Sequence, residues 1–188
     1  MTDIERARAA IDAAHAADPR GGSPGGGETL YADRVEQWIG RLAAPVSLAL
    51  RLAARAQHIE RWAIPRADFP EGRGGYLRWR SAVHRRQGDR VREILTAAGC
   101  DAALADRVAA LVAKAAPRED AEAQALEDAA CLVFLEHELL DFAAQHPREK
   151  TIDVLRKTWR KMSPAGHAAA QALTLAPEAQ ALVGEALA

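Results

Sequence analysis

The residues between His58 and Arg80 have the side-chain types of an anion-binding site. This segment contains five arginines and four of the nine aromatic residues of the chain. Arginine presents a rigid fork of N–H donors that matches a carboxylate or a phosphate, and it stacks on aromatic rings. Aromatic side chains add a rigid, largely apolar wall. The segment therefore predicts contacts to an anionic substrate from Arg61, Trp62, Arg66, Arg73, Tyr76, Trp79 and Arg80.

The backbone of the same segment is irregular. Two prolines and three glycines lie between Ile64 and Gly75, which excludes a regular helix over this stretch. Long ordered loops in compact domains are frequently functional. A structural alternative stays open, in which the loop is buried and its arginines neutralise an acidic helix.

Two histidines are candidate metal ligands near this loop. His58 ends an apolar run, where a single histidine is more often structural than functional. Farther on, the spacings of four, four and three residues place Tyr76, Arg80, His84 and Gln87 on one helix face. His84 can thus approach the same site as His58, and Gln87 is equally well placed.

A pair of acids lies inside a strongly apolar helical segment, residues 125–135. Glu127 and Asp128 are adjacent, so on a helix their side chains point about 100° apart and cannot both avoid the core. A buried carboxylate requires a metal ion, an arginine or several N–H donors. Both acids are candidate catalytic residues, and Asp128 is also a candidate metal ligand. A structural carboxylate paired with arginine is the alternative.

Composition predicts an all-α protein. Hydrophobic residues make up 49% of the 188 residues and aromatic residues only 5%, while alanine is abundant. Alanine is the best helix former and is depleted in strands. No segment combines period-two alternation with β-branched residues. The chain is expected to form a single compact helical domain over residues 1–188, with seven to nine helices and a flexible glycine-rich loop at 18–29.

The expected helices follow from apolar periodicity and from capping residues. Thr2 and Glu5 form a predicted capping box that opens the first helix. Pro45 stands where a first-turn proline belongs in the third. A short helix after Ser163-Pro164 and a last one after Pro177 complete the set. The predicted helices that precede Ser163 span residues 3–17, 30–42, 45–62, 76–98, 101–115, 121–145 and 148–162.

Charge argues against a large nucleic acid footprint or an anionic membrane as partner, because the formal net charge is −1. Locally, residues 51–92 hold 11 Lys/Arg against 4 Asp/Glu, and residues 119–141 hold 8 Asp/Glu and no Lys/Arg. The two stretches neutralise each other if they pack together; otherwise the first attracts anions.

The chain is expected to be cytoplasmic. Cys100 and Cys131 lack metal-type spacing, which favours reduced structural thiols. The first 17 residues contain acids and no apolar stretch of signal-peptide length, and no apolar run approaches the roughly 20 residues of a membrane span.

Four stretches of the chain resemble a bacterial family of unknown function, domain of unknown function 4202. The stretches are His58-x-x-Arg61-Trp62-x-x-Pro65-Arg66, Arg73-x-Gly75-Tyr76-Leu77-x-Trp79-Arg80, Leu126-Glu127-Asp128-x-Ala130-Cys131-Leu132-Val133-Phe134-Leu135 and Leu155-Arg156-Lys157-Thr158-Trp159. The resemblance covers nearly the whole chain. It implies no reaction, and the family pattern has a histidine at the position of Gln87.

The order of elements is also loosely similar to that of HD-domain metal phosphohydrolases, which are all-α. That resemblance implies a divalent metal ion with His58 as first ligand and Asp128 as last. This chain has no His-Asp dipeptide, so the middle ligands are either missing or replaced by His84. Two hypotheses result. One is a metal-dependent hydrolase of a phosphorylated or nucleotide-type small molecule, and the other is a non-catalytic protein that binds anions or RNA through residues 58–80.

Overall fold

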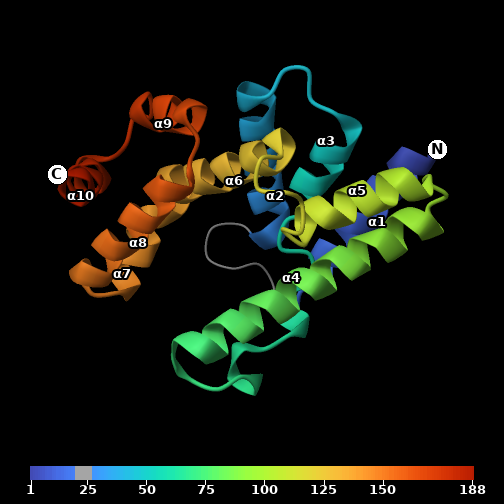
Figure 1. Ribbon diagram of the computed structural model, residues 1–188, viewed down its shortest axis with the longest axis horizontal. Helices are drawn as coiled ribbons and strands as arrows, with labels where there is room; N and C mark the ends of the chain where they lie inside the picture. The colour runs from blue at the N-terminus through green and yellow to red at the C-terminus, as the bar shows by residue number, and fades with distance from the viewer. Residues whose placement is uncertain (20–26) are drawn as a thin grey trace.

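The computed structural model describes residues 1–19 and 27–188 (Figure 1). Within these residues the chain is helical and contains no strand, so the predicted all-α class is confirmed. The ten α-helices are α1 (Asp3–Ala16), α2 (Gly27–Leu42), α3 (Leu48–Arg55), α4 (Gly72–Ala97), α5 (Ala102–Val112), α6 (Ala121–Val133), α7 (Leu139–Gln145), α8 (Arg148–Lys161), α9 (Pro164–Gln171) and α10 (Pro177–Leu187).

Side-chain caps explain where several of these helices begin. The predicted capping box is present: the Thr2 side chain accepts from the Glu5 amide, and the Glu5 carboxylate accepts from the Thr2 amide at 2.7 Å. Asp101 and Asp120 are side-chain N-caps of α5 and α6, since their carboxylates accept from backbone N–H groups of the first turn that have no partner within the helix. Ser163 caps α9 and is followed by the proline at its first position, as predicted.

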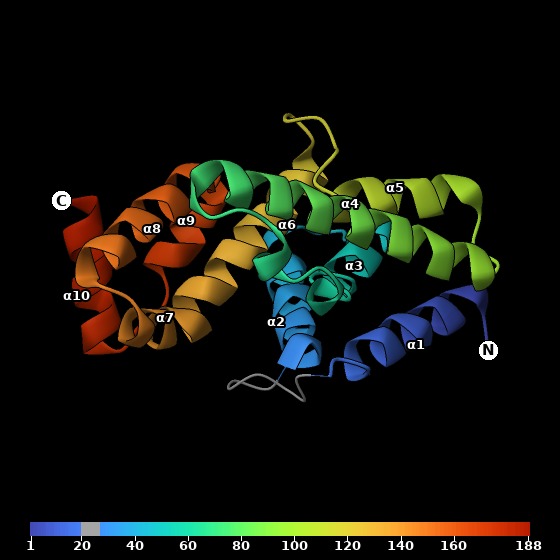
Figure 2. The same cartoon turned by 90° about the horizontal axis from the view of Figure 1, so that it is seen from below.

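The helices form two groups joined by α6. Figures 1 and 2 both show α1, α5 and the C-terminal half of α4 at the end with the N-terminus, and α7 to α10 at the end with the C-terminus. The hairpin of α4 and α5 is tightly packed, because a Cβ on Gly88 would lie 2.8 Å from the Ala113 Cβ. One continuous core of buried aliphatic residues runs through both groups and includes Ile11, Val35, Leu95, Leu132 and Leu155.

The third helix is shorter than predicted at both ends. Residues 45–62 were expected to be one helix, but Pro45 follows a cis peptide bond and Ser47 is the N-cap. The helix ends at Arg55, and His58 and Glu60 then adopt left-handed backbone angles, with φ of 63° and 45°. A left-handed residue cannot continue a right-handed helix, so the chain turns here.

The connection from α3 to α4 contains two short 3-10 turns, Arg61–Ala63 and Arg66–Asp68. Residues 64–75 were expected to contain no regular helix. This is confirmed for 64–71, but α4 already begins at Gly72, whose φ is +80°. Gly75 allows the connection to pass against α4, since a Cβ there would lie 1.7 Å from the Pro70 carbonyl oxygen. The helix then continues unbroken through Gly88, four residues longer at its start than predicted.

Residues 121–145 are continuously helical, as predicted, but a π-helical segment at Phe134–Glu138 separates α6 from α7. This division raises the number of helices to ten, one above the expected range. π-Helical turns are rare and are frequently found near functional sites.

Most of the predicted glycine-rich loop lies outside the described residues, since 20–26 belong to the undescribed part. Its last three residues, 27–29, are helical and open α2. Among the described residues, none of the helices is long and apolar enough to cross a membrane.

Candidate functional site

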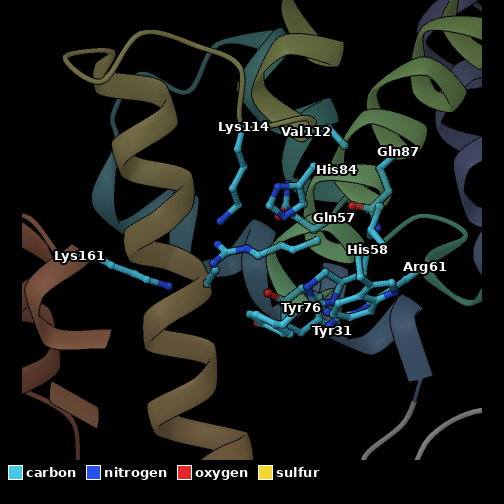
Figure 3. A pocket seen from close by; sticks show the side chains of 14 residues that line it. Tyr31, Gln57, His58, Arg61, Tyr76, His84, Gln87, Val112, Lys114 and Lys161 are labelled. Atoms are coloured by element: carbon cyan, nitrogen blue, oxygen red, sulfur yellow. The ribbon is translucent and has the colours of Figure 1, made fainter. Parts of the chain in front are cut away.

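A cavity of about 220 Å³ lies where α2, α4 and α6 meet the turn after α3 (Figure 3). Its wall is mainly polar and cationic, with an aromatic side. The lining residues are Tyr31, Gln57, His58, Arg61, Tyr76, Trp79, Arg80, Val83, His84, Gln87, Val112, Lys114, Ala130 and Lys161. Six of the residues predicted from the sequence as site residues are therefore brought together here, namely His58, Arg61, Tyr76, Trp79, Arg80 and His84.

His58 is held at the cavity by an acid and an aromatic ring. Its Nδ1 lies 3.2 Å from Oε2 of Glu28, at the start of α2. Its ring stacks on Tyr31, with centroids 4.3 Å apart and an angle of 12° between the planes. The left-handed backbone of His58 is unfavourable for a residue with a side chain, and such strain concentrates at functional sites.

The carboxyl group of Glu28 is ionised at neutral pH. Burial opposes its ionisation, but the hydrogen bond from His58 and the nearby positive charges outweigh burial and lower the pKa of Glu28. Burial raises the pKa of Glu138, another carboxyl group close to His58. With Nδ1 directed at an ionised carboxylate, Nε2 of His58 is the ring nitrogen available to a ligand.

One face of α4 forms the longest wall of the cavity. Tyr76, Arg80, His84 and Gln87 all line it, which confirms the face predicted from their spacing. Trp79 anchors this helix to the preceding connection, because its Nε1 donates to the Ile64 carbonyl at 2.9 Å. The connection in turn places the Arg61 guanidinium over the Trp79 ring, 5.2 Å from its centroid.

Gln87 has an unsatisfied donor at the cavity. Its side chain is buried, with 4% exposure, yet its Nε2 has no hydrogen-bond partner in the structure. Figure 3 shows this side chain extending from α4 toward His58 and Arg61. A buried amide donor without a partner costs about 1–3 kcal/mol, so the site is set up for an acceptor from a ligand or water.

Two lysines complete the cationic wall from the opposite side. Lys114, just after α5, and Lys161, the last residue of α8, both form ion pairs with Glu127 of α6. The Lys161 Nζ lies 3.3 Å from the carboxylate. Figure 3 shows both lysines reaching toward the cavity from the side away from His58. Glu127 is therefore a partner of cavity lysines and does not itself line the cavity.

The electrostatic environment of the cavity is positive. Among the described residues, Arg61 and Arg80 form no ion pair with a carboxylate, and none of the lining residues is acidic. Burial lowers the pKa of His84 to about 4, and the charges of Lys114 and Arg80 contribute. His84 is thus a neutral side chain at pH 7.

Three predicted substrate contacts lie outside the cavity wall. Arg66 stabilises the connection, because it donates to the carbonyls of Phe69 at 2.8 Å and Pro70 at 3.0 Å. Arg73 is exposed at the start of α4, and Trp62 is half-buried in the first 3-10 turn. Sequence composition alone does not separate arginines that build a loop from those that face a ligand.

Asp128 has a structural environment. It is buried, and its carboxylate accepts from the Ser163 amide at 2.8 Å, the Ser163 hydroxyl at 2.5 Å and the Gln124 side chain at 3.0 Å. Gly166 allows this contact, since a Cβ there would lie 2.7 Å from the carboxylate. The acid connects α6 to the start of α9, with hydroxyl and amide donors in place of the arginine considered from the sequence.

The predicted metal ligands do not converge. His58 and His84 share the cavity, whereas Asp128 is absent from its lining. Over residues 1–19 and 27–188, no group of three or more His, Cys, Asp or Glu side chains is arranged to hold a metal ion. Within the acidic stretch, Glu127 pairs with Lys114 and Lys161, neither of which belongs to the arginine-rich stretch.

Sequence reasoning missed five members of the site: Glu28, Tyr31, Gln57, Lys114 and Lys161. The only sequence signal near them was the end of the apolar run at Gln57-His58. Lys114 adopts a left-handed backbone, with φ of 53°, which only the structure reveals.

Comparison with known proteins places the chain in a family. The family model described as Domain of unknown function (DUF4202) matches residues 5–183, which is nearly the whole chain. No curated protein and no solved structure matches it.

Replacing Asp128 by Asn should destabilise the fold. An amide in place of the carboxylate cannot accept all three hydrogen bonds, and a mismatched buried donor costs about 1–3 kcal/mol. Urea denaturation measures this loss as a lower midpoint. The matched control is Asp153→Asn on the exposed face of α8, which should change stability by less than about 0.5 kcal/mol. Equal effects of both variants would contradict the structural role of Asp128.

His84 should make the protein less stable as the pH falls below neutrality. In the unfolded chain a histidine binds its proton near pH 6.5, whereas folded His84 has a pKa of about 4 because it is buried beside cations. Between these values the unfolded state binds more protons, so acidification favours unfolding. Burial lowers the pKa of His15 as well, so the effect is shared.

Thermal melts of the wild type and of His84→Asn at pH 7 and pH 5 test this expectation. The wild type should lose more of its melting temperature than the variant between these two pH values, and the two should behave alike between pH 7 and pH 8. An equal loss in both proteins would contradict the assigned environment of His84.

Proposed function

The chain belongs to the DUF4202 family, and we propose that its cavity binds a small molecule through a phosphate or a comparable anionic group. The observation that carries this proposal is the composition of the wall: two arginines and two lysines line one cavity, and none of its lining residues is acidic. The ionised Glu28 lies next to the site and is bonded to His58. Clustered cations in a partly enclosed site attract and hold anions. Arg61 and Arg80 offer the forked donors that suit a phosphate.

Neutral groups support the same ligand class. The free Nε2 donor of Gln87 is available to a phosphate oxygen, and Gln57 lines the same cavity. Tyr31, Tyr76 and Trp79 give the site an aromatic side, on which a flat group attached to the anion can lie. A phosphorylated compound with a ring next to the phosphate therefore matches the site better than a free inorganic ion. A cytoplasmic location is part of the proposal.

Hydrolysis of the bound phosphate ester is a second candidate function, favoured by the pair of His58 and Glu28. A histidine whose Nδ1 faces a carboxylate has its Nε2 available to take a proton from the water whose oxygen bonds to phosphorus. The phosphorus–ester oxygen bond breaks, the alcohol leaves with the proton that the histidine returns, and the arginines stabilise the charge on the phosphate. The metal-dependent, HD-like form of this hypothesis has less support, because Asp128 is already bonded to Ser163 and Gln124. A His58→Asn variant separates the two candidates, since it should keep binding and lose turnover only if the protein is an enzyme.

Phenyl phosphate should bind to the purified protein at low salt, and Arg80→Gln should weaken the binding about tenfold or more. Arg80 has no ion pair with any described carboxylate, so its loss removes a charge-assisted contact worth about 1.5–3 kcal/mol. Isothermal titration calorimetry measures both affinities. The matched control is Arg85→Gln, an exposed arginine of the same helix outside the cavity, which should bind like the wild type.

The proposal fails if phenyl phosphate does not bind at low salt, or if the two arginine variants weaken it equally. Phenol should show no binding in the same assay, because the phosphate is the group that the cations recognise.

A further inference from the structure

A larger groove of about 770 Å³ lies next to the cavity. It runs between the beginning of α4 and one face of α8, with Phe142 of α7 at its side. Tyr76, Arg80 and Lys161 line both the cavity and the groove, so the two spaces lie side by side and share part of their walls. A ligand whose anionic end is in the cavity can therefore continue into the groove.

The groove is basic. Five cationic side chains line it against one acid, namely Arg80, Lys150, Lys157, Arg160 and Lys161 against Asp153. Asp153 is already paired with Lys157, whose Nζ lies 2.5 Å from its carboxylate. Along α8, Lys150, Val154, Lys157 and Lys161 follow at spacings of four, three and four residues, which places them on one helix face. Positive charge thus extends along the groove as a row that begins at the cavity.

Apolar and aromatic surface accompanies this row of charges. Tyr76 is 45% exposed at the junction of cavity and groove, and its ring rests against Trp79 with centroids 5.7 Å apart. Phe142 and Val154 add apolar surface farther along. An exposed aromatic ring beside cations is the arrangement on which nucleic acid bases stack while the phosphates are neutralised.

We propose that the cavity and the groove together bind the phosphorylated end of a single-stranded nucleic acid. The terminal phosphate lies in the cavity, the first base stacks on Tyr76, and the next phosphates contact Lys157 and Arg160 of α8. This inference rests on the proposed function, because the cavity must accept a phosphate for the strand to be held by its end.

The footprint is short, which agrees with the overall charge of the chain. A net charge of −1 does not favour a long polyanion, whereas a local excess of cations in one groove is sufficient for a few nucleotides. The aromatic surface distinguishes a nucleotide chain from inorganic polyphosphate, which has no group to stack.

Oligothymidylates of one to four nucleotides, each with a 5′-phosphate, test this inference by calorimetry at low salt. Affinity should rise about tenfold or more from one nucleotide to three, as stacking and backbone contacts are added. Removing the 5′-phosphate from the longest strand should weaken its binding by a similar factor. Inorganic triphosphate should bind no better than the mononucleotide.

Substitutions of residues that line only the groove test whether the phosphates after the first one bind there. Lys157→Gln combined with Arg160→Gln should abolish the gain with length but leave the mononucleotide unaffected, because both residues line only the groove. The slope of affinity against salt should fall by about 0.7 for each phosphate that the variant no longer neutralises. Tyr76→Phe should keep the affinity and Tyr76→Ala should lose it, while Arg85→Gln serves as the control for charge.

The outcomes separate this inference from the proposed function. Phenyl phosphate binding together with an affinity independent of strand length overturns the nucleic acid inference and leaves the phosphate site intact. Strands that bind equally well without the 5′-phosphate also overturn it, because the end is then not recognised. If neither phenyl phosphate nor any strand binds, both proposals fail.

Discussion

The constraint on which the site depends is the concentration of four positive charges around one small cavity. Arg61, Arg80, Lys114 and Lys161 come from separate parts of the chain, and like charges brought together in a partly buried space repel one another. Among the described residues, only Glu127 offsets them by direct pairing, and it contacts the two lysines and neither arginine. The fold must therefore hold the arginines against repulsion, and an anion that enters the cavity relieves it.

The helices supply that restraint through neutral contacts. Trp79 is bonded to the Ile64 carbonyl and lies under Arg61, so one indole fixes both the connection and the arginine. The close approach of α4 and α5 at Gly88 sets the helix that presents Arg80 and His84. His84 remains neutral beside these charges, with its pKa lowered by burial, which limits the repulsion at physiological pH. Binding of an anion should accordingly stabilise the folded state, as for any ligand that prefers it.

The sequence predicts the helical class, most helix ranges and the face of α4 that lines the cavity, because these follow from periodicity within one element. The left-handed turn at His58 and Glu60 escapes prediction, since neither residue is a glycine and their conformation depends on tertiary contacts. Glu28 and Lys161 escape it for a related reason: they reach the site from opposite ends of the chain, and a single sequence has no signal of that proximity.

For the two adjacent acids of α6, the need for partners can be predicted from the sequence, but the identity of the partners cannot. The sequence indicates correctly that two adjacent carboxylates in an apolar helix need partners, and the structure supplies partners for both Glu127 and Asp128. It does not indicate which partners. Asp128 accepts hydrogen bonds from Ser163 and Gln124. The acid that was predicted to be a metal ligand therefore joins α6 to the start of α9.

A crystal structure of the protein grown with phenyl phosphate would show directly whether the cavity binds the phosphate. The phosphate should lie inside the cavity, within hydrogen-bond distance of Arg61 and Arg80, with Gln87 Nε2 donating to one of its oxygens. A phosphate bound elsewhere on the molecule, with this cavity filled only by water, would contradict this expectation.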